Sequence, residues 1–366
     1  MTRAGVYAAA GLFVLTVLYI LFGPVVFGNA VGFDRAGASA TSSGAFGFTM
    51  KPKVPQLDRA AYDAKMLANA NLSSATLELL ASTTVTEAEK AKVKWPVKSA
   101  AYPNAGALLP FNRIIAYYGN FFSKGMGVLG EYPEAVMLEK LRGEVAAWEA
   151  ADPSTPVIPA IHYIVTTAQL QPQKDGMYTL RMPDDQIDKA IAIAEKINGI
   201  VFIDFQVGLS TLQKELPHYE KYLAHPKVHL GIDPEFSMKT GDKPGRVIGS
   251  YDAVDINFAA EYLARLVREN NLPPKILVIH RFTFDMVTNA ERIVPLPEVQ
   301  IVMDMDGWGD KAKKIGTYTR VIVPEPVQFT GFKLFYKNDL FAPSTGMFTP
   351  SELLKLSPQP IYIQYQ

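Results

Sequence analysis

The strongest candidates for chemistry in this sequence are carboxylates near the ends of apolar runs. Glu235 follows Asp233 by two residues at the end of the run 228–236. On a β-strand this spacing places both side chains on one face. Two neighbouring carboxyl groups disfavour each other's charge, so the pKa of one of them rises, which suits a general acid. Glu235 is therefore the best candidate for a proton donor, with Asp233 beside it.

Other polar residues occupy similar positions. Asp204 and Asp304 are two further candidates for catalysis. The candidates for substrate binding are Tyr118, Gln206, His280, Asp306, Trp308, Lys333 and Gln364. A single buried aspartate is often satisfied by a neighbouring lysine or a backbone amide. Several buried carboxylates near one lysine instead need a ligand, a metal ion or mutual pKa shifts.

Eight short runs of β-branched and aromatic residues carry these side chains. Strands are predicted at 113–119, 157–165, 200–208, 228–236, 275–282, 299–307, 329–337 and 361–366, and helices at 134–151, 184–197, 211–224, 256–270 and 350–356. Strands that alternate with helices indicate right-handed crossovers and a parallel sheet. Eight such units in about 250 residues predict an α/β fold, a (β/α)8 TIM-type barrel. The last strand runs to the end of the sequence, so its helix is missing or is replaced by the N-terminal helix.

The alternative fold is an open, doubly wound sheet. Such a sheet usually carries a glycine-rich phosphate turn after its first strand, and Tyr118-Gly119-Asn120 is not that turn. In a barrel, side-chain alternation places Val228, Leu230 and Ile232 against the helices and turns the intervening residues toward the barrel axis. Active sites of these barrels lie at the C-terminal ends of the strands. The candidate residues therefore converge on one mouth, where His162 and Tyr362 are further polar residues of strands two and eight.

Glycoside hydrolysis is the leading hypothesis because it needs two carboxyl groups across the scissile bond. Five aromatic residues could stack on sugar rings: Tyr117, Tyr118, Phe236, Trp308 and Tyr336. One alternative is a barrel that binds a glycan or a partner without catalysis. A second is a hydrolase with a divalent cation held by His280, Asp304, Asp306, Asp233 and Glu235. A third is Schiff-base chemistry at Lys333. No cofactor is expected.

The ending Asp233-Pro234-Glu235 resembles the Asp-x-Glu placement of barrel glycosidases that act on amino-sugar polymers, such as chitinase-like and lysozyme-like enzymes. This resemblance implies that Glu235 protonates the glycosidic oxygen while Asp233 orients an acetamido group. The segments 117–133, 231–236, 304–309 and 331–336 also resemble a family of uncharacterised bacterial secreted proteins and putative lipoproteins, over residues 113–366.

An apolar N-terminal segment predicts a membrane anchor. No charged residue lies between Gly5 and Val31, and about 20 apolar residues suffice to span a bilayer. Arg3 on the short N-terminal side favours an extracytoplasmic domain. We expect a single-pass anchor at 1–31, a linker and helical pre-domain at 32–112, and the barrel at 113–366. A cleaved signal peptide and a buried core helix are the alternatives. The expected partner is a cell-envelope glycan.

Two loops of the predicted barrel could shape its mouth. The segment 237–252 is long and glycine-rich and could form a lid, and the glycine-rich stretch 125–130 could approach a ligand closely. Both could equally be ordinary surface connections.

The overall composition excludes several classes. Lysine plus arginine equals aspartate plus glutamate at 36 each in 366 residues, and no basic patch is interleaved with aromatics, so no nucleic-acid partner is expected. The absence of cysteine excludes disulfides, thiolate metal sites, a cysteine nucleophile and a lipid-attachment cysteine.

Overall fold

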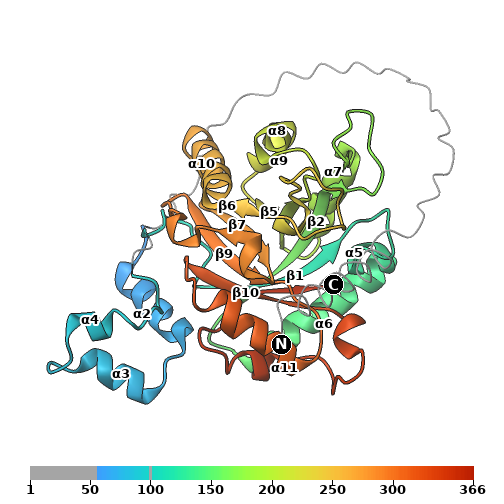
Figure 1. Cartoon of the computed structure of the whole chain (residues 1–366). Coiled ribbons are helices and arrows are strands. Elements are labelled where there is room, and N and C mark those ends of the chain that lie inside the picture. The colour runs from blue at the N-terminus through green and yellow to red at the C-terminus, as the bar shows by residue number, and fades with distance from the viewer. Residues whose placement is uncertain (1–55, 99–100) are drawn as a thin grey trace, which may run out of the picture.

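The computed structural model describes residues 56–98 and 101–366, and its centre is a closed barrel of eight parallel strands (Figure 1). The strands are β1 (Arg113–Gly119), β2 (Val157–Ala168), β4 (Ile200–Phe205), β5 (Val228–Ile232), β7 (Lys275–Arg281), β9 (Val299–Met305), β10 (Phe329–Leu334) and β11 (Tyr362–Tyr365). Strand β1 pairs with both β11 and β2, which closes the barrel. The predicted TIM-type α/β barrel and its eight strands are thus confirmed.

Helices surround the barrel in most of the crossovers (Figure 1). The long ones are α6 (Glu134–Ala151), α7 (Asp184–Glu195) and α10 (Ala253–Asn270). Shorter ones are α5 (Val128–Glu131), α8 (Leu212–Glu215), α9 (Glu220–Leu223), α11 (Lys311–Thr317) and α12 (Pro350–Leu353). The helix predicted at 211–224 is broken because Pro217 opens a 3-10 turn between α8 and α9. Helix α11 was not predicted.

The crossover from β7 to β9 contains 3-10 turns and the two-residue strand β8 (Val287–Thr288) in place of an α-helix. Strand β8 pairs with β6 (Tyr251–Asp252) outside the barrel. A further short strand, β3 (Thr179–Arg181), pairs antiparallel with the end of β2. Strands β3, β6 and β8 thus extend the structure at the C-terminal ends of the barrel strands, where the site lies.

Side chains alternate between two cores as predicted. Val228, Leu230 and Ile232 belong to the large outer core between the barrel and its helices. Residues of opposite parity, such as Phe202 and Val278, fill the barrel interior near the N-terminal ends of the strands. This inner core is apolar at its base and becomes polar toward the mouth.

Three short helices precede the barrel: α2 (Arg59–Ala70), α3 (Ser74–Ala81) and α4 (Glu87–Lys90). Helix α2 packs Tyr62 and Met66 into the inner core at the N-terminal end of the barrel, while α3 and α4 lie further out (Figure 1). Asn69 ties α2 to the segment before β11 through two hydrogen bonds with Gln359. The helical stretch predicted between the linker and the barrel is confirmed.

The predicted membrane segment lies outside the described residues. Among the helices that are described, none is both long and apolar enough to cross a bilayer.

Candidate active site at the barrel mouth

A pocket opens at the C-terminal ends of the barrel strands. Three carboxylates that follow strands β5 and β9 line it, namely Asp233, Glu235 and Asp306. Lys333 of β10 joins them. The remaining wall includes six aromatic residues: Tyr118, Phe236, Phe282, Trp308, Phe335 and Tyr336.

The segment Asp233-Pro234-Glu235 turns sharply at the end of β5. The Asp233 carboxylate accepts a hydrogen bond from the backbone nitrogen of Glu235 (3.1 Å) and so caps the 3-10 turn Pro234–Phe236. Its second oxygen accepts a hydrogen bond from the side-chain amide of Gln206 (3.4 Å). Asp233 is thereby fixed, and the turn that it caps carries Glu235 at the pocket wall.

Lys333, Asp306 and Tyr118 form the floor of the pocket. The Lys333 ammonium lies 3.0 Å and 3.2 Å from the two carboxylate oxygens of Asp306. It also lies 3.9 Å from the centre of the Tyr118 ring. A cation that is both paired with a carboxylate and placed over an aromatic face is held in one position.

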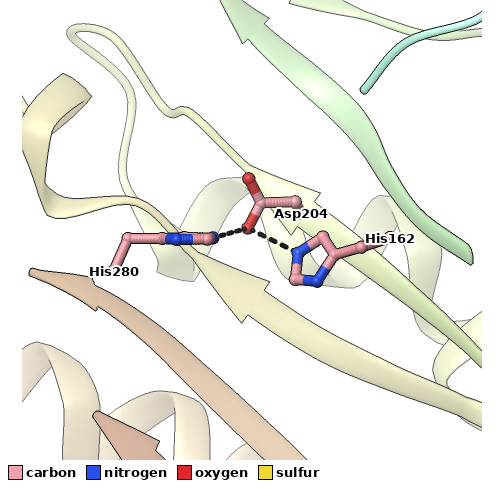
Figure 2. A group of neighbouring side chains, drawn as sticks. All are labelled: His162, Asp204 and His280. Atoms are coloured by element: carbon pink, nitrogen blue, oxygen red, sulfur yellow. Dashed lines mark ion pairs between the residues drawn. The ribbon is translucent and has the colours of Figure 1, made fainter. Parts of the chain in front are cut away.

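Four fully buried residues lie beneath this floor, and we call them the buried tier: His162, Asp204, His280 and Asp304. The Nε2 atoms of His162 and His280 approach one oxygen of Asp204, Oδ1, at 3.3 Å and 3.4 Å (Figure 2). The Nδ1 atom of His280 lies 3.3 Å from Asp304 and 3.2 Å from Asp306. The remaining oxygen of Asp204 accepts a hydrogen bond from Tyr118 (3.1 Å). The buried tier is therefore connected directly to the pocket floor.

His162 is oriented from its other side. Its Nδ1 atom makes a 2.6 Å hydrogen bond with the hydroxyl of Tyr362, which also accepts a hydrogen bond from Gln364 (2.7 Å). The imidazole ring stacks on Phe202, with a 7° angle between the planes. These contacts direct Nε2 of His162 toward the barrel axis.

Two glycines make room for the buried carboxylates. A Cβ atom at Gly231 of β5 would stand 2.3 Å from Asp204 Oδ1 and 2.4 Å from His162 Nε2. A Cβ atom at Gly331 of β10 would stand 2.5 Å from Asp304 Oδ1. The absence of side chains at these two positions is thus a condition for packing the buried tier inside the barrel.

The carboxyl groups at the mouth have pKa values that are shifted in opposite directions. Burial raises the pKa of Glu235 well above its ordinary value, and the charges of Asp233 and Asp306 act in the same direction. Burial also raises the pKa of Asp233 to about 7. For Asp306, burial alone would raise the pKa, but Lys333 and His280 outweigh it and keep the pKa below its ordinary value. One wall of the pocket therefore offers a proton and the floor offers a carboxylate.

The buried tier shows a similar division. Burial lowers the pKa of His162 to about 4, against the attraction of Asp204. For His280, burial acts in the same sense, but Asp204 and the other carboxylates outweigh it and raise the pKa well above its ordinary value. Burial would raise the pKa of Asp204, and the two histidines instead keep it low. By itself, the chain favours a neutral His162 and a cation at His280.

The structure divides the predicted site residues between two levels. Glu235 and Asp233 line the pocket, whereas the other two predicted catalytic residues, Asp204 and Asp304, lie beneath it. Of the predicted substrate-binding residues, Tyr118, Gln206, Asp306, Trp308 and Lys333 line the pocket. The other two, His280 and Gln364, are fully buried below.

Two further expectations need correction. Tyr117 cannot stack on a ligand in the pocket, because it faces the outer core, where its hydroxyl bonds that of Tyr336 at 2.8 Å. Consecutive strand residues point to opposite faces, so only Tyr118 of this pair reaches the axis. The proposed lid 237–252 contributes no residue to the pocket lining, since its start folds back to pair with Gly208. The glycine-rich stretch does line the pocket, through Gly125 and Gly127.

Sequence reasoning placed His162 and Tyr362 at the mouth without a specific role, whereas His162 belongs to the buried tier and Tyr362 orients it. A usable signal was present, because His162 shares its strand face with Ala160, a member of the inner core. Its parity therefore places it inside the barrel, where a polar ring needs polar partners.

No protein-family model matches the chain, and neither does any curated protein. Among solved structures, a sugar phosphate isomerase/epimerase from Parabacteroides distasonis ATCC 8503 aligns with 69% of this chain and 86% of its own, at 9% identity and a TM-score of 0.32. Dihydropteroate synthase from Burkholderia cenocepacia aligns with 70% of this chain and 86% of its own, at 9% identity and a TM-score of 0.31. The barrel assignment itself rests on the strand pairing.

Proposed function

We propose that this barrel is a glycoside hydrolase acting on a cell-envelope glycan, with Glu235 as its proton donor. The observation that carries the proposal is the position of Glu235 in the mouth pocket, which two further strand-end carboxylates, Asp233 and Asp306, also line. Hydrolysis of a glycosidic bond needs one carboxyl group that holds a proton and another that stays ionised. The mouth supplies both within one pocket.

Glu235 suits the role of the acid. Its neighbours in the pocket are Asp233 on its own turn, Asp306 after β9, and Lys333 of β10, with His280 of β7 below. Burial and the two carboxylates favour the protonated form, and they outweigh the two cations. A carboxyl group that stays protonated near neutral pH can donate to a leaving-group oxygen.

Asp306 suits the role of the ionised partner. Its ion pair with Lys333 at 3.0 Å keeps the negative charge in place on the pocket floor. The transition state of glycoside hydrolysis develops positive charge on the sugar ring, which a nearby carboxylate stabilises. Asp233 caps the turn that carries Glu235 and therefore lies close enough to assist it. This position agrees with the acetamido-orienting role that the Asp-x-Glu resemblance implies.

The aromatic wall supports a sugar ligand. Trp308, Phe236 and Tyr336 line the pocket together with the carboxylates. Binding sites are commonly apolar with a few convergent polar groups. Schiff-base chemistry at Lys333 is less well supported, because a nucleophilic lysine needs a free amine and the Lys333 side chain is engaged by Asp306.

The proposal is tested with the purified chain incubated with peptidoglycan, chitin oligomers and other bacterial glycans while new reducing ends are measured. We expect cleavage by the wild type and a loss of at least about 100-fold in Glu235→Gln, as for removal of a general acid. Glu131→Gln is the matched control, because Glu131 also lines the pocket but pairs with Lys337 at its edge (2.7 Å). It should retain activity.

Two outcomes would contradict the hydrolase proposal. Cleavage that persists in Glu235→Gln would remove the assigned acid. Glycan binding without cleavage by the wild type would favour a non-catalytic binding barrel, which remains the second candidate because two of the strand-end carboxylates, Asp204 and Asp304, lie out of reach below the pocket.

The proposed location is the cell membrane, with residues 1–31 as a single-pass anchor and the barrel on the extracytoplasmic side. The apolar segment between Gly5 and Val31 is the observation that supports it. Fractionation of cells that express the full chain or a chain lacking residues 1–31 tests the anchor. We expect only the full chain in the membrane fraction, with its barrel open to protease added to spheroplasts. A full chain found in the soluble fraction would contradict the anchor.

A further inference from the structure

Figure 2 shows the side chains of His162, Asp204 and His280, and each offers one ligand atom close enough to the others to share a metal ion. Nε2 of His162 and Nε2 of His280 lie 3.3 Å and 3.4 Å from Asp204 Oδ1. A zinc-type ion with bonds of about 2.1 Å holds tetrahedral ligands about 3.4 Å apart. One ligand atom from each of the three residues lies within 4.8 Å of those of the other two.

Hydrogen bonding does not explain this cluster. The two separations are short enough for hydrogen bonds, yet among the described residues neither Nε2 atom nor Asp204 Oδ1 makes one. Neither approach is therefore aligned as a good hydrogen bond requires. Buried polar atoms without partners are costly, and three of them facing one another are expected where they bind a common ion.

Charge leads to the same conclusion. Three carboxylates, Asp204, Asp304 and Asp306, lie within 3.4 Å of the His280 ring nitrogens, and Asp306 also pairs with the Lys333 ammonium. A divalent cation bound at this cluster would offset the negative charge that these carboxylates bring into the barrel interior.

The outer contacts of the two histidines match those of metal ligands. A metal-bound imidazole usually presents its other nitrogen to a carboxylate, a hydroxyl or a carbonyl, which orients the ring. Nδ1 of His162 bonds the Tyr362 hydroxyl, and Nδ1 of His280 faces Asp304 and Asp306. Both Nε2 atoms are thereby left for the cluster.

We propose that His162, Asp204 and His280 bind one divalent first-row transition-metal ion of the zinc type inside the barrel. Two imidazoles and a carboxylate suit such an ion, whereas calcium and magnesium prefer oxygen ligands throughout. The site lies beneath the pocket, and the Asp204–Tyr118 and His280–Asp306 contacts link it to the pocket floor. This inference stands on separate residues from the proposed glycosidase chemistry and does not depend on it.

The test measures metal bound to the full chain. The wild type is unfolded with a chelator, refolded with zinc or cobalt, passed through a desalting column and analysed by mass spectrometry for metal content, with visible spectroscopy for cobalt. Because all three residues are fully buried, uptake is expected during refolding. We expect one equivalent of metal and a cobalt spectrum of nitrogen and oxygen ligands.

The variants Asp204→Asn and His280→Gln should lose the bound metal and the cobalt spectrum. His218→Gln is the matched control, because His218 lies exposed on the 3-10 turn between α8 and α9, and it should retain one equivalent. Tyr362→Phe keeps the ring but removes the hydroxyl from His162, so metal affinity should fall about 10-fold with the fold intact by circular dichroism. A wild type that retains no metal, or equal retention by a folded Asp204→Asn, would overturn the proposal.

Discussion

Gly231 shows how closely the interior of this barrel is packed at the level of single residues. A Cβ atom added to it would meet two atoms of the buried tier, Asp204 Oδ1 and His162 Nε2. A side chain of any size at this position must displace at least one of them. Space for chemistry inside the barrel thus depends on a residue that carries no functional group.

The first prediction concerns Gly231→Ala, which should lower the free energy of unfolding by about 1–3 kcal/mol through overpacking. It should also abolish metal retention, because the added Cβ would stand 2.3 Å from Asp204 Oδ1. Chemical denaturation and metal analysis check both effects. Gly143→Ala in α6 is the control: nothing lies within 4 Å of its added Cβ. That change should stabilise the helix by about 0.5–1 kcal/mol. Equal effects of the two changes would contradict the packing argument.

Lys275, at the start of β7, carries a second residue-level prediction. Its ammonium is fully buried and donates to the backbone oxygens of His225 (2.5 Å) and Val228 (2.8 Å). Burial lowers its pKa to about 7. The unfolded chain keeps a lysine pKa near 10.4, so between these values the unfolded state binds more protons. The contribution of Lys275 to stability should therefore rise with pH, by up to about 1.4 kcal/mol per unit.

This pH dependence is measured by urea denaturation of the wild type and Lys275→Met between pH 7 and 10. The difference between the two proteins should change with pH, with the wild type gaining stability relative to the variant as pH increases. Lys227→Met, at an exposed position before β5, should run parallel to the wild type. A constant difference between the wild type and Lys275→Met would contradict the lowered pKa.

Residue types and parity predicted which side chains face the barrel axis, but not how deep each one lies. Asp204 and Asp233 both point inward at the ends of adjacent strands, yet Asp204 lies in the buried tier and Asp233 lines the pocket. Depth depends on the stagger between strands, such as the pairing of Asp204 with Gly231. That register arises from tertiary packing and has no local signature in the sequence.

At the scale of elements, the crossover from β7 to β9 stands out because an arginine network takes the place of a helix. Arg281 is fully buried and donates to the backbone oxygens of Thr283 (3.2 Å), Phe284 (2.9 Å) and Val287 (3.2 Å). It also lies 2.6 Å from Glu325 in the next crossover. One side chain thereby satisfies backbone groups that a helix would have satisfied internally.

The third prediction is that Arg281→Met destabilises the protein by about 3 kcal/mol, since three backbone acceptors lose their donor at about 1 kcal/mol each. Thermal and urea denaturation measure this loss. Arg292→Met, in the same crossover but with a highly exposed side chain, should stay within about 0.5 kcal/mol of the wild type. A similarly small effect at Arg281 would show that the network does not hold the crossover.

The elements themselves were largely predictable, and the exceptions have local causes. Runs such as 113–119 and 275–282 are rich in β-branched residues and are bounded by polar residues. Their predicted bounds therefore agree closely with those of β1 and β7. Helix α11 lacks an apolar stripe: its one buried residue is Lys314, which donates to the backbone of Gly307 and Lys333. A helix that buries a lysine gives no amphipathic signal.

At the scale of the whole molecule, helix α2 completes the barrel at the end opposite the pocket. Tyr62 and Met66 enter the inner core together with Leu109, and the Tyr62 ring meets Tyr102 and Phe111 edge to face at 5.7 Å and 6.2 Å. A segment that precedes the barrel in sequence is therefore part of its core. A shortened chain for activity assays should begin before Arg59.

The fourth prediction is that Tyr62→Ala lowers the free energy of unfolding by about 3–5 kcal/mol, as for other buried aromatic residues. Because the pocket lies at the opposite end, the reducing-end assay should be unchanged at temperatures where the variant is folded. Leu67→Ala on the exposed side of the same helix should change stability by less than about 0.5 kcal/mol. A small effect of Tyr62→Ala would mean that α2 is not needed to close the barrel.

The central claim is that the pocket wall raises the pKa of Glu235 well above its ordinary value, which suits it to donate a proton. The most direct measurement is a carbon-13 NMR titration of the chain labelled at glutamate side-chain carboxyls, with Glu235→Gln used to assign the signal. We predict a single carboxyl resonance, absent in the variant, that titrates well above the ordinary glutamate range near pH 4.3. A Glu235 resonance that titrates in the ordinary range would contradict the proton-donor assignment, and with it the hydrolase proposal.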